Sequence, residues 1–331
     1  MFQVKNWKKF LVMSMACTAL LGTASTTHGA YSLNDEVANP PVALQMATQI
    51  GMLEYENPTM KSVANKDAIV ILSFGTTYAD SRKKNIDATV KAIQRAHKNV
   101  KTVVAFTSHI VIKHIAENEG SCPYKTPEEV LDQLKREGYT RIALVPLAIV
   151  PGMEYKYDVA LFHQYKTQFK KMTLATPLMY WQGQEDQPDD VMAAMEALDL
   201  PAYKKGTAIL LMAHGTPDPS NAYYSVMQAK LKAMKRNDVH IYTVEGWPSL
   251  DDWVGKLKMH KVENIILMPL MLVAGDHANN DMAGEEEDSH KSILEAAGFN
   301  VTVKLQGLGE NKKIRELFVN HANEAWDALI K

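Results

Sequence analysis

The sequence predicts an α/β protein built from two similar doubly wound domains that face each other across a cleft. Its 331 residues suit about two domains. From residue 67 onward, short apolar runs alternate with amphipathic stretches, which is the pattern of βαβ units in parallel sheets. The halves also repeat each other in order: IVILSFGT (69–76) aligns with ILLMAHGT (209–216), and RIALVPLAIVPG (141–152) aligns with NIILMPLMLVAG (264–275). We interpret this as an internal duplication.

The individual elements follow from apolar runs and helix signals. In the first half we expect strands at 68–74, 102–107, 141–150 and 172–176, and helices at 81–97, 109–118 and 127–137. The third helix has a clear start, because Thr126 and Glu129 form a capping box around Pro127. The second half repeats the scheme, with strands at 207–213, 240–244, 264–272 and 300–305, and helices at 221–236, 249–259, 289–297 and 311–330.

The N-terminus has the three-part pattern of a secretory signal peptide. Lysines between residues 5 and 9 precede an apolar run over 10–21, which is too short to span a bilayer, and small residues follow. Cleavage after Ala24 and cleavage after Ala30 both remain open. We therefore expect a periplasmic protein that has no membrane anchor once the signal peptide is removed. Cleavage would leave Cys122 alone, so no internal disulfide is expected.

These boundaries divide the chain into four parts. The signal peptide takes residues 1–30, and an N-terminal extension at 31–65 contains a short helix candidate near 42–52. The first α/β domain is expected at 66–198 and the second at 199–331.

Composition and missing motifs exclude several classes of function. The chain has 38 acidic and 36 basic residues, a net charge of −2, whereas a nucleic-acid partner calls for a clustered basic excess. No glycine-rich loop ends in Gly-Lys-Ser/Thr, so the sequence offers no phosphate cradle for ATP. A two-domain enzyme or binding protein remains.

The duplicated strand ends carry the candidate site residues. Ligands of open parallel sheets bind beyond the carboxyl ends of the strands. At the first repeated junction the halves carry Phe74 and His214, and at the second they carry Glu154 and His277. A third strand end adds Glu245. A lone histidine is more often structural, but two imidazoles with one or two carboxylates suit a first-row divalent ion, and the open coordination positions are typical of catalytic sites.

Acidic residues are dense just after the second of these histidines. Residues 281–290 contain Asp281, the four acids at 285–288, and His290. The segment suits collection or relay of a divalent cation. It equally suits a solvated helix N-terminus, where the macrodipole favours acidic side chains. The sequence leaves both interpretations open.

Five strings in the chain resemble the anaerobic cobaltochelatases of cobalamin biosynthesis. These enzymes are sirohydrochlorin chelatases of the single-subunit, ATP-independent class and are related to ferrochelatase. The strings are SFGTT (73–77), GMEY (152–155), AHGT (213–216), VEG (244–246) and MPLMLVAGDHA (268–278). The resemblance covers about residues 66 to 331, and it implies a two-domain, flavodoxin-like chelatase fold.

Carried over by position, the resemblance implies a role for each cleft residue. His214 and His277 would be metal ligands and proton acceptors, Glu245 a third metal ligand, and Glu154 a catalytic carboxylate. The implied reaction is insertion of Co²⁺, or alternatively Fe²⁺, into the tetrapyrrole sirohydrochlorin by a lyase of the metal chelatase type, without ATP. A homo-oligomer is common for such enzymes. This chain departs from some relatives at Ala148, where they carry a histidine.

Two further expectations concern substrate binding and the alternative function. A polycarboxylate tetrapyrrole favours basic residues at the cleft rim, with Arg82, Lys83, Lys84 and Lys156 as candidates, although a solvated surface side chain is the simpler interpretation of each. Because cobalamin synthesis is normally cytoplasmic, the signal peptide also suggests a second function, an exported carrier of a metal, haem or another tetrapyrrole.

Overall fold

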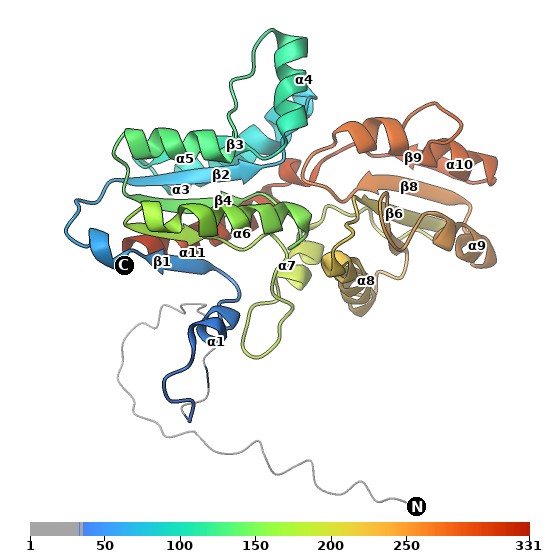
Figure 1. The fold of residues 1–331 in the computed structure, drawn as a ribbon. Helices are drawn as coiled ribbons and strands as arrows, with labels where there is room; N and C mark the ends of the chain where they lie inside the picture. Colours follow the sequence, from blue (N-terminus) through green and yellow to red (C-terminus); the bar gives the residue numbers. More distant parts are fainter. Residues whose placement is uncertain (1–32, 34–35) are drawn as a thin grey trace, which may run out of the picture.

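The computed structural model describes Leu33 and residues 36–331. The predicted signal peptide and both candidate cleavage sites lie outside the described residues. The described chain forms two α/β units whose strands direct their carboxyl ends toward each other (Figure 1). Within this part of the chain, none of the helices combines the length and the apolarity that crossing a bilayer requires.

The first sheet has five strands in the order β1-β5-β4-β2-β3. Four of them are parallel, and β1 is an antiparallel edge strand beside β5. The bounds are β1 Leu53–Glu56, β2 Asp67–Ser73, β3 Lys101–Phe106, β4 Arg141–Pro146 and β5 Lys171–Leu174. Both faces of the central strands are apolar because helices cover both: Val70 packs among residues of α5 and α6, and Ile71 among residues of α3 and α11.

The second sheet repeats the first without the edge strand. Its four parallel strands run in the order β7-β6-β8-β9, which matches β3-β2-β4-β5 position by position. The bounds are β6 Thr207–Ala213, β7 Val239–Thr243, β8 Asn264–Pro269 and β9 Asn300–Val303. The shared strand order confirms the predicted fold of two similar doubly wound units.

Most helices lie where the sequence predicts them. The first long helix is continuous through α2 (Ala79–Arg82), a π-helical segment (Lys83–Asp87) and α3 (Ala88–Ala96). The others are α1 Val42–Ala47, α4 His109–Glu119, α5 Pro127–Arg136, α6 Met153–Tyr165, α7 Asp190–Ala197, α8 Tyr223–Ala233, α9 Asp251–Met259, α10 His290–Ala296 and α11 Lys312–Ile330. The capping box that Thr126 and Glu129 form at the start of α5 is present.

Two predicted strands end earlier than expected, and in the same way. The runs at 141–150 and 264–272 leave their sheets at Pro146 and Pro269. Proline has no N–H group to donate to a neighbouring strand. One more backbone hydrogen bond to the central strand follows each proline, from Leu147 to Leu72 and from Leu270 to Met212, and the ladder ends there. The residues that follow turn away from the sheets and line the cleft between the two units.

Three elements were not predicted from the sequence. β1 belongs to the segment expected as an extension, α7 lies in the connection between the units, and α6 begins within the GMEY string. Helix α6 escaped detection because its buried side chains do not form a simple apolar stripe: Tyr155, Asp158 and Tyr165 are buried together with Leu161 and Phe162.

The last helix does not pack where the predicted boundary puts it. Helix α11, expected within the second domain at 199–331, contacts α3, β4, β5 and α7 on the first unit. Its buried face includes Phe318 and His321. The predicted boundary places this helix in the second domain by sequence, whereas its apolar face completes the cover of the first sheet.

Candidate metal centre

A cleft of about 470 Å³ lies between the carboxyl ends of the two sets of strands. Its walls come from the loops after β2, β4, β6, β7 and β8, with Val111 added from α4, the helix that projects from the first unit (Figure 1). The walls are mainly apolar. A volume of this order and this character are typical of small-molecule sites.

The duplicated loops meet each other across this cleft. A Cβ atom added to Gly152 would lie 3.5 Å from Thr216 Oγ1, and one added to Gly275 would lie 3.2 Å from Thr76 Oγ1. Gly152 is equivalent to Gly275 in the duplication, and Thr76 is equivalent to Thr216. The same glycine–threonine approach therefore occurs twice, once with the glycine from the first half and once with the glycine from the second. The contacts hold the candidate residues of both halves at a single site.

His214 and Glu245 are brought together by their backbones. Gly215, which follows His214, has a φ of 88°, and a Cβ atom there would lie 2.0 Å from the carbonyl oxygen of Glu245. Only glycine tolerates both conditions. The loop after β7 therefore approaches the loop after β6, and the Glu245 N–H donates to the His214 carbonyl at 2.7 Å.

His277 lies just before the π-helical segment Ala278–Met282. Its Nδ1 is 2.5 Å from Oδ2 of Asp281, and Nδ1 of His214 is 3.1 Å from the Gly215 carbonyl oxygen. An acceptor beside Nδ1 favours the tautomer with its proton there, which leaves the lone pair of Nε2 available to a metal.

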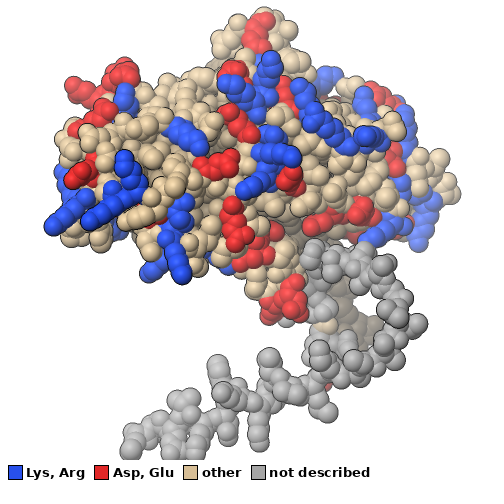
Figure 2. Space-filling model, turned by 180° about the vertical axis from the view of Figure 1, so that it is seen from behind, with Lys and Arg blue, Asp and Glu red and all other residues tan. Residues whose placement is uncertain are grey.

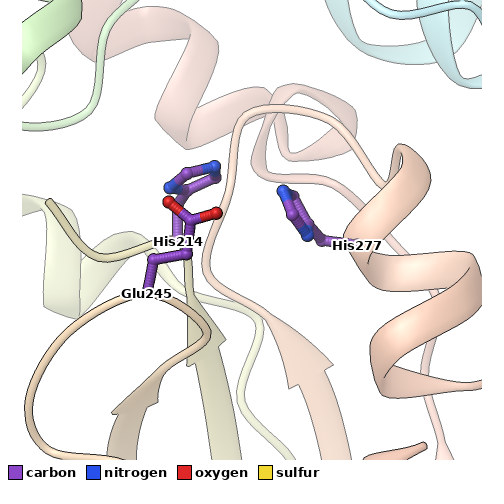
Figure 3. A group of neighbouring side chains, drawn as sticks. All are labelled: His214, Glu245 and His277. Carbon is purple, nitrogen blue, oxygen red and sulfur yellow. The ribbon is translucent and has the colours of Figure 1, made fainter.

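The three predicted ligands form one cluster. The ligand atoms of His214, Glu245 and His277 all lie within 4.8 Å of one another, and the two rings are 4.8 Å apart at 87°. Figure 3 shows the Glu245 carboxylate beside the His214 ring, with His277 facing both from its own loop. Metal–ligand bonds of about 2 Å keep the donor atoms of one ion within roughly 4 Å of one another. A small rotation of these side chains would bring their donor atoms to that separation.

Glu154 lines the cleft from the first unit and does not belong to this cluster. It lies in the first turn of α6. Its side chain is open to the cleft, yet the surrounding protein removes much of its hydration, and this desolvation raises the pKa of Glu154 to about 7. A carboxyl that titrates near neutrality is suited to accept and release protons.

On the first unit, the position equivalent to His214 is apolar. Phe74, the equivalent of His214, is 49% exposed and lines the cleft, as do the exposed Met153 and the buried Ala148. The ligand cluster therefore belongs to the second unit alone, and the first unit supplies an apolar wall together with Glu154.

The predicted basic rim is only partly present. Arg82 is buried and forms an ion pair with Glu119 at 2.7 Å, so its assignment to the rim is wrong. Lys156 reaches across from the first unit and pairs with Asp218 of the second. This contact lowers the pKa of Asp218 to about 2 and ties the two units together beside the cleft.

The acidic segment after His277 divides into separate contacts. Asp281 accepts from His277, Glu285 pairs with Lys291 at 2.8 Å, and His290 Nδ1 lies 2.9 Å from the Tyr242 hydroxyl. Asp281 was not predicted from the sequence to contact His277, one of the three candidate metal ligands. Its spacing of four from His277 was the available signal, since residues four apart share one face of a helix.

The chain is similar to known chelatases over most of its length. A family model described as cobalt chelatase (CbiK) matches residues 67–327. Sirohydrochlorin cobaltochelatase of Salmonella typhimurium is 33% identical over 268 residues, which cover 80% of this chain and 98% of the relative. Sirohydrochlorin cobaltochelatase CbiKC of Nitratidesulfovibrio vulgaris is 30% identical over 287 residues, which cover 84% and 97%.

Solved structures show the same fold at lower identity. SirB from Bacillus subtilis with Fe³⁺ is 18% identical with a TM-score of 0.52, and the match covers 78% of this chain and 95% of that one. The sirohydrochlorin chelatase SirB of subspecies spizizenii in complex with cobalt is 13% identical with a TM-score of 0.50, covering 79% and 96%. Since the family match spans nearly the whole two-unit fold and both sequence relatives are covered almost end to end, the chain belongs to the cobalt chelatase (CbiK) family.

Proposed function

We propose that this protein inserts a divalent metal into sirohydrochlorin without ATP, with Co²⁺ as its metal and Fe²⁺ as the alternative. The observation that carries the proposal is the cluster of His214, Glu245 and His277 on one wall of a mainly apolar cleft. The choice of tetrapyrrole is supported by the names of the two relatives. The choice of metal is supported by those names and by the cobalt and Fe³⁺ complexes of SirB.

Insertion exchanges one metal ion for two protons, because the free macrocycle has two inner N–H groups. The metal first binds Nε2 of His214, Nε2 of His277 and a Glu245 oxygen, and its open positions face the cleft. As the ring nitrogens replace these ligands, the imidazoles become free to accept pyrrole protons. A neutral imidazole is a suitable proton acceptor at neutral pH.

Glu154 accepts a proton on the other side of the cleft. Its pKa of about 7 keeps a share of the carboxylate ionised at neutral pH and allows a captured proton to leave again. Phe74 and Met153 support the face of the macrocycle on this wall. Among the described residues that line the cleft there is no lysine or arginine, so we place the substrate carboxylates at the mouth, where Lys156 lies.

The test is a spectrophotometric assay of purified protein with sirohydrochlorin and Co²⁺. We expect a rate well above the spontaneous background, the same rate with and without ATP, and measurable turnover with Fe²⁺. No rate above background overturns the proposal. Stoichiometric binding of a tetrapyrrole that is never metallated would instead favour the exported carrier.

We also propose that the protein is exported to the periplasm and acts there. The lysines, the short apolar run and the small residues before residue 31 support this. We expect N-terminal sequencing of the periplasmic protein to begin after residue 24 or 30; a chain that keeps Met1 in the cytoplasmic fraction contradicts it.

The binding partners that we propose are a divalent metal ion and a tetrapyrrole. We also propose that the protein forms a homo-oligomer, and sedimentation measures its oligomeric state directly. We propose no nucleic-acid partner and no membrane anchor in the mature chain. On the back of the molecule, basic and acidic side chains are interspersed without a large area of one sign (Figure 2), which supports the omission of nucleic acid.

A further inference from the structure

Glu154 has a second carboxyl group one helical turn behind it. Asp158 follows it by four residues on α6, so the two side chains lie on one face of the helix. Glu154 opens into the cleft, whereas Asp158 is only 3% exposed. The pair thus leads from the cleft into the interior of the first unit.

Asp158 lacks the contacts that would stabilise its charged form. Its Oδ1 is buried and has no hydrogen-bond partner. Burial, and then the charge of Glu154, raise the pKa of Asp158 well above its usual range. An unpaired buried carboxylate is strongly unfavourable, so Asp158 holds a proton in the resting protein.

The surroundings of Asp158 agree with this. The titratable groups nearby are phenols and carboxyls: Tyr155 and Tyr157 on α6, Glu128 and Asp132 on α5, and Tyr180 after β5. Three cations on the elements packed against α6 are engaged elsewhere: Arg141 pairs with Asp67, Lys171 pairs with Glu54, and Lys166 lies over the rings of Tyr55 and Phe162. Lys135 and Arg136, at the far end of α5, are exposed.

The duplication repeats this arrangement at a metal ligand. Glu154 and His277 are equivalent residues, and Asp281 follows His277 at the same spacing at which Asp158 follows Glu154. Oδ2 of Asp281 lies 2.5 Å from the His277 ring. Each half therefore has a cleft-facing acid or base with an aspartate behind it, and the aspartate of the first half is the one kept away from solvent.

We propose that Glu154 and Asp158 form a proton relay that removes protons from the cleft during metal insertion. The inference rests on the proposed function. A pyrrole N–H bond breaks, its electron pair stays on the nitrogen that binds the metal, and the proton forms an O–H bond on Glu154. Glu154 passes this proton to one oxygen of Asp158 while the proton already on Asp158 leaves from the other oxygen to the Tyr157 hydroxyl, which gives its own proton to Glu128, so neither Asp158 nor Tyr157 gains net charge.

The route onward runs between α5 and α6. The Tyr157 hydroxyl donates to Oε1 of Glu128 at 2.6 Å, and Asp158 is near enough to add to the rise in the Tyr157 pKa that burial and Glu128 cause. Oε2 of Glu128 is buried without a hydrogen-bond partner. Glu128 as a whole is half-buried at the start of α5, so a proton taken up by its buried Oε2 would be released from there to solvent.

The relay is tested with Asp158→Asn, which keeps the shape and neutrality of the resting side chain but cannot exchange a carboxyl proton. We expect kcat to fall by about tenfold or more, with KM for sirohydrochlorin and the affinity for Co²⁺ unchanged. The double variant Glu154→Gln/Asp158→Asn should be no slower than Glu154→Gln alone, because the two residues act in one path. A wild-type kcat in Asp158→Asn, or multiplicative losses in the double variant, overturns the relay.

The matched control is Asp132→Asn on α5. Asp132 accepts from the Tyr165 hydroxyl at 3.2 Å in the same helix interface but outside the proposed path, and we expect wild-type kinetics from its variant. Should Asp158→Asn fail to fold, Asp158→Ser gives the same comparison. A loss of kcat in Asp132→Asn equal to that in Asp158→Asn would show a structural effect and overturn the relay.

An infrared titration separates the relay from the proposed function. At neutral pH the wild type should show a protonated-carboxyl band that Asp158→Asn lacks, whether or not the protein metallates sirohydrochlorin. If the wild type inserts no metal, the proposed function fails by the assay above. If the band does not depend on Asp158, the relay fails even in an active enzyme.

Discussion

The environment of each histidine determines whether its side chain lines the cleft or packs in the interior. His214 and His277 line the cleft, and an oxygen atom beside Nδ1 of each ring favours the tautomer whose Nε2 lone pair is available to a metal. His321 is buried against Thr176 and Asp190, and His97 is buried beside Trp326. The duplication alone identified the first two, because it placed them at strand ends that the fold brings together. The contact between Asp281 and His277 was missed although the two residues are four apart, because no helix was predicted at 278–282.

Replacing either His214 or His277 with alanine should abolish chelation and leave the fold intact, because both side chains follow strand ends outside the core. Asp281→Asn should weaken metal binding by roughly 10- to 100-fold, since it removes the acceptor that orients His277. Calorimetric Co²⁺ titration and circular dichroism measure both effects. His260→Ala, an exposed histidine after α9, is the control. An alanine variant that still inserts metal contradicts the ligand assignment.

The two cleft glutamates should separate binding from turnover. Glu245→Gln loses an anionic ligand, so it should weaken Co²⁺ binding more than it slows the remaining turnover at saturating metal. Glu154→Gln should do the reverse, because Glu154 lies outside the ligand cluster and its proposed role is proton transfer. Metal affinity and kcat of both variants decide the matter. Equal losses of metal affinity would show that Glu154 is also a ligand.

Among the elements, regular strands and capped helices were predictable, and those whose faces mix polar and apolar residues were not. Every strand of the repeat was expected within a few residues, since buried parallel strands are continuous apolar runs. Helix α6 has buried Tyr155 and Asp158 on its inner face, so no apolar stripe marks it. The position of α11 depends on long-range packing, which local sequence does not encode.

The docking of α11 should make stability depend on pH through His321. Burial lowers the pKa of His321, but the hydrogen bond and charge of Asp190 outweigh it and raise this pKa above its usual value. The stabilisation is therefore fully present below about pH 6.5, the unfolded pKa, and is lost as pH rises through the folded pKa. Urea unfolding should show a larger loss for His321→Gln at about pH 6 than at about pH 8. His260→Gln should show neither loss, and equal losses for His321→Gln at both pH values would contradict the ion pair.

At the scale of the whole molecule, we expect that the two units do not fold independently. Helix α11 covers β4, β5 and α3 from the far end of the chain. A fragment of residues 36–198 exposes that apolar face, so we expect it to remain unfolded by circular dichroism. Adding a peptide of residues 308–331 should restore structure. A fragment that folds cooperatively alone would instead support the boundary predicted at residue 198.

The doubled contact between threonine and glycine across the cleft has the form of an isologous interface, in which residue i of one copy meets residue j of the other and j meets i. Two identical half-length subunits could build the same cleft around a twofold axis. Strict symmetry would then give both walls the same side chain at the first strand end. Covalent fusion removes that constraint, so one wall carries the proposed metal ligand His214 while its counterpart on the other wall is Phe74, and the two faces of a flat substrate would meet different chemistry.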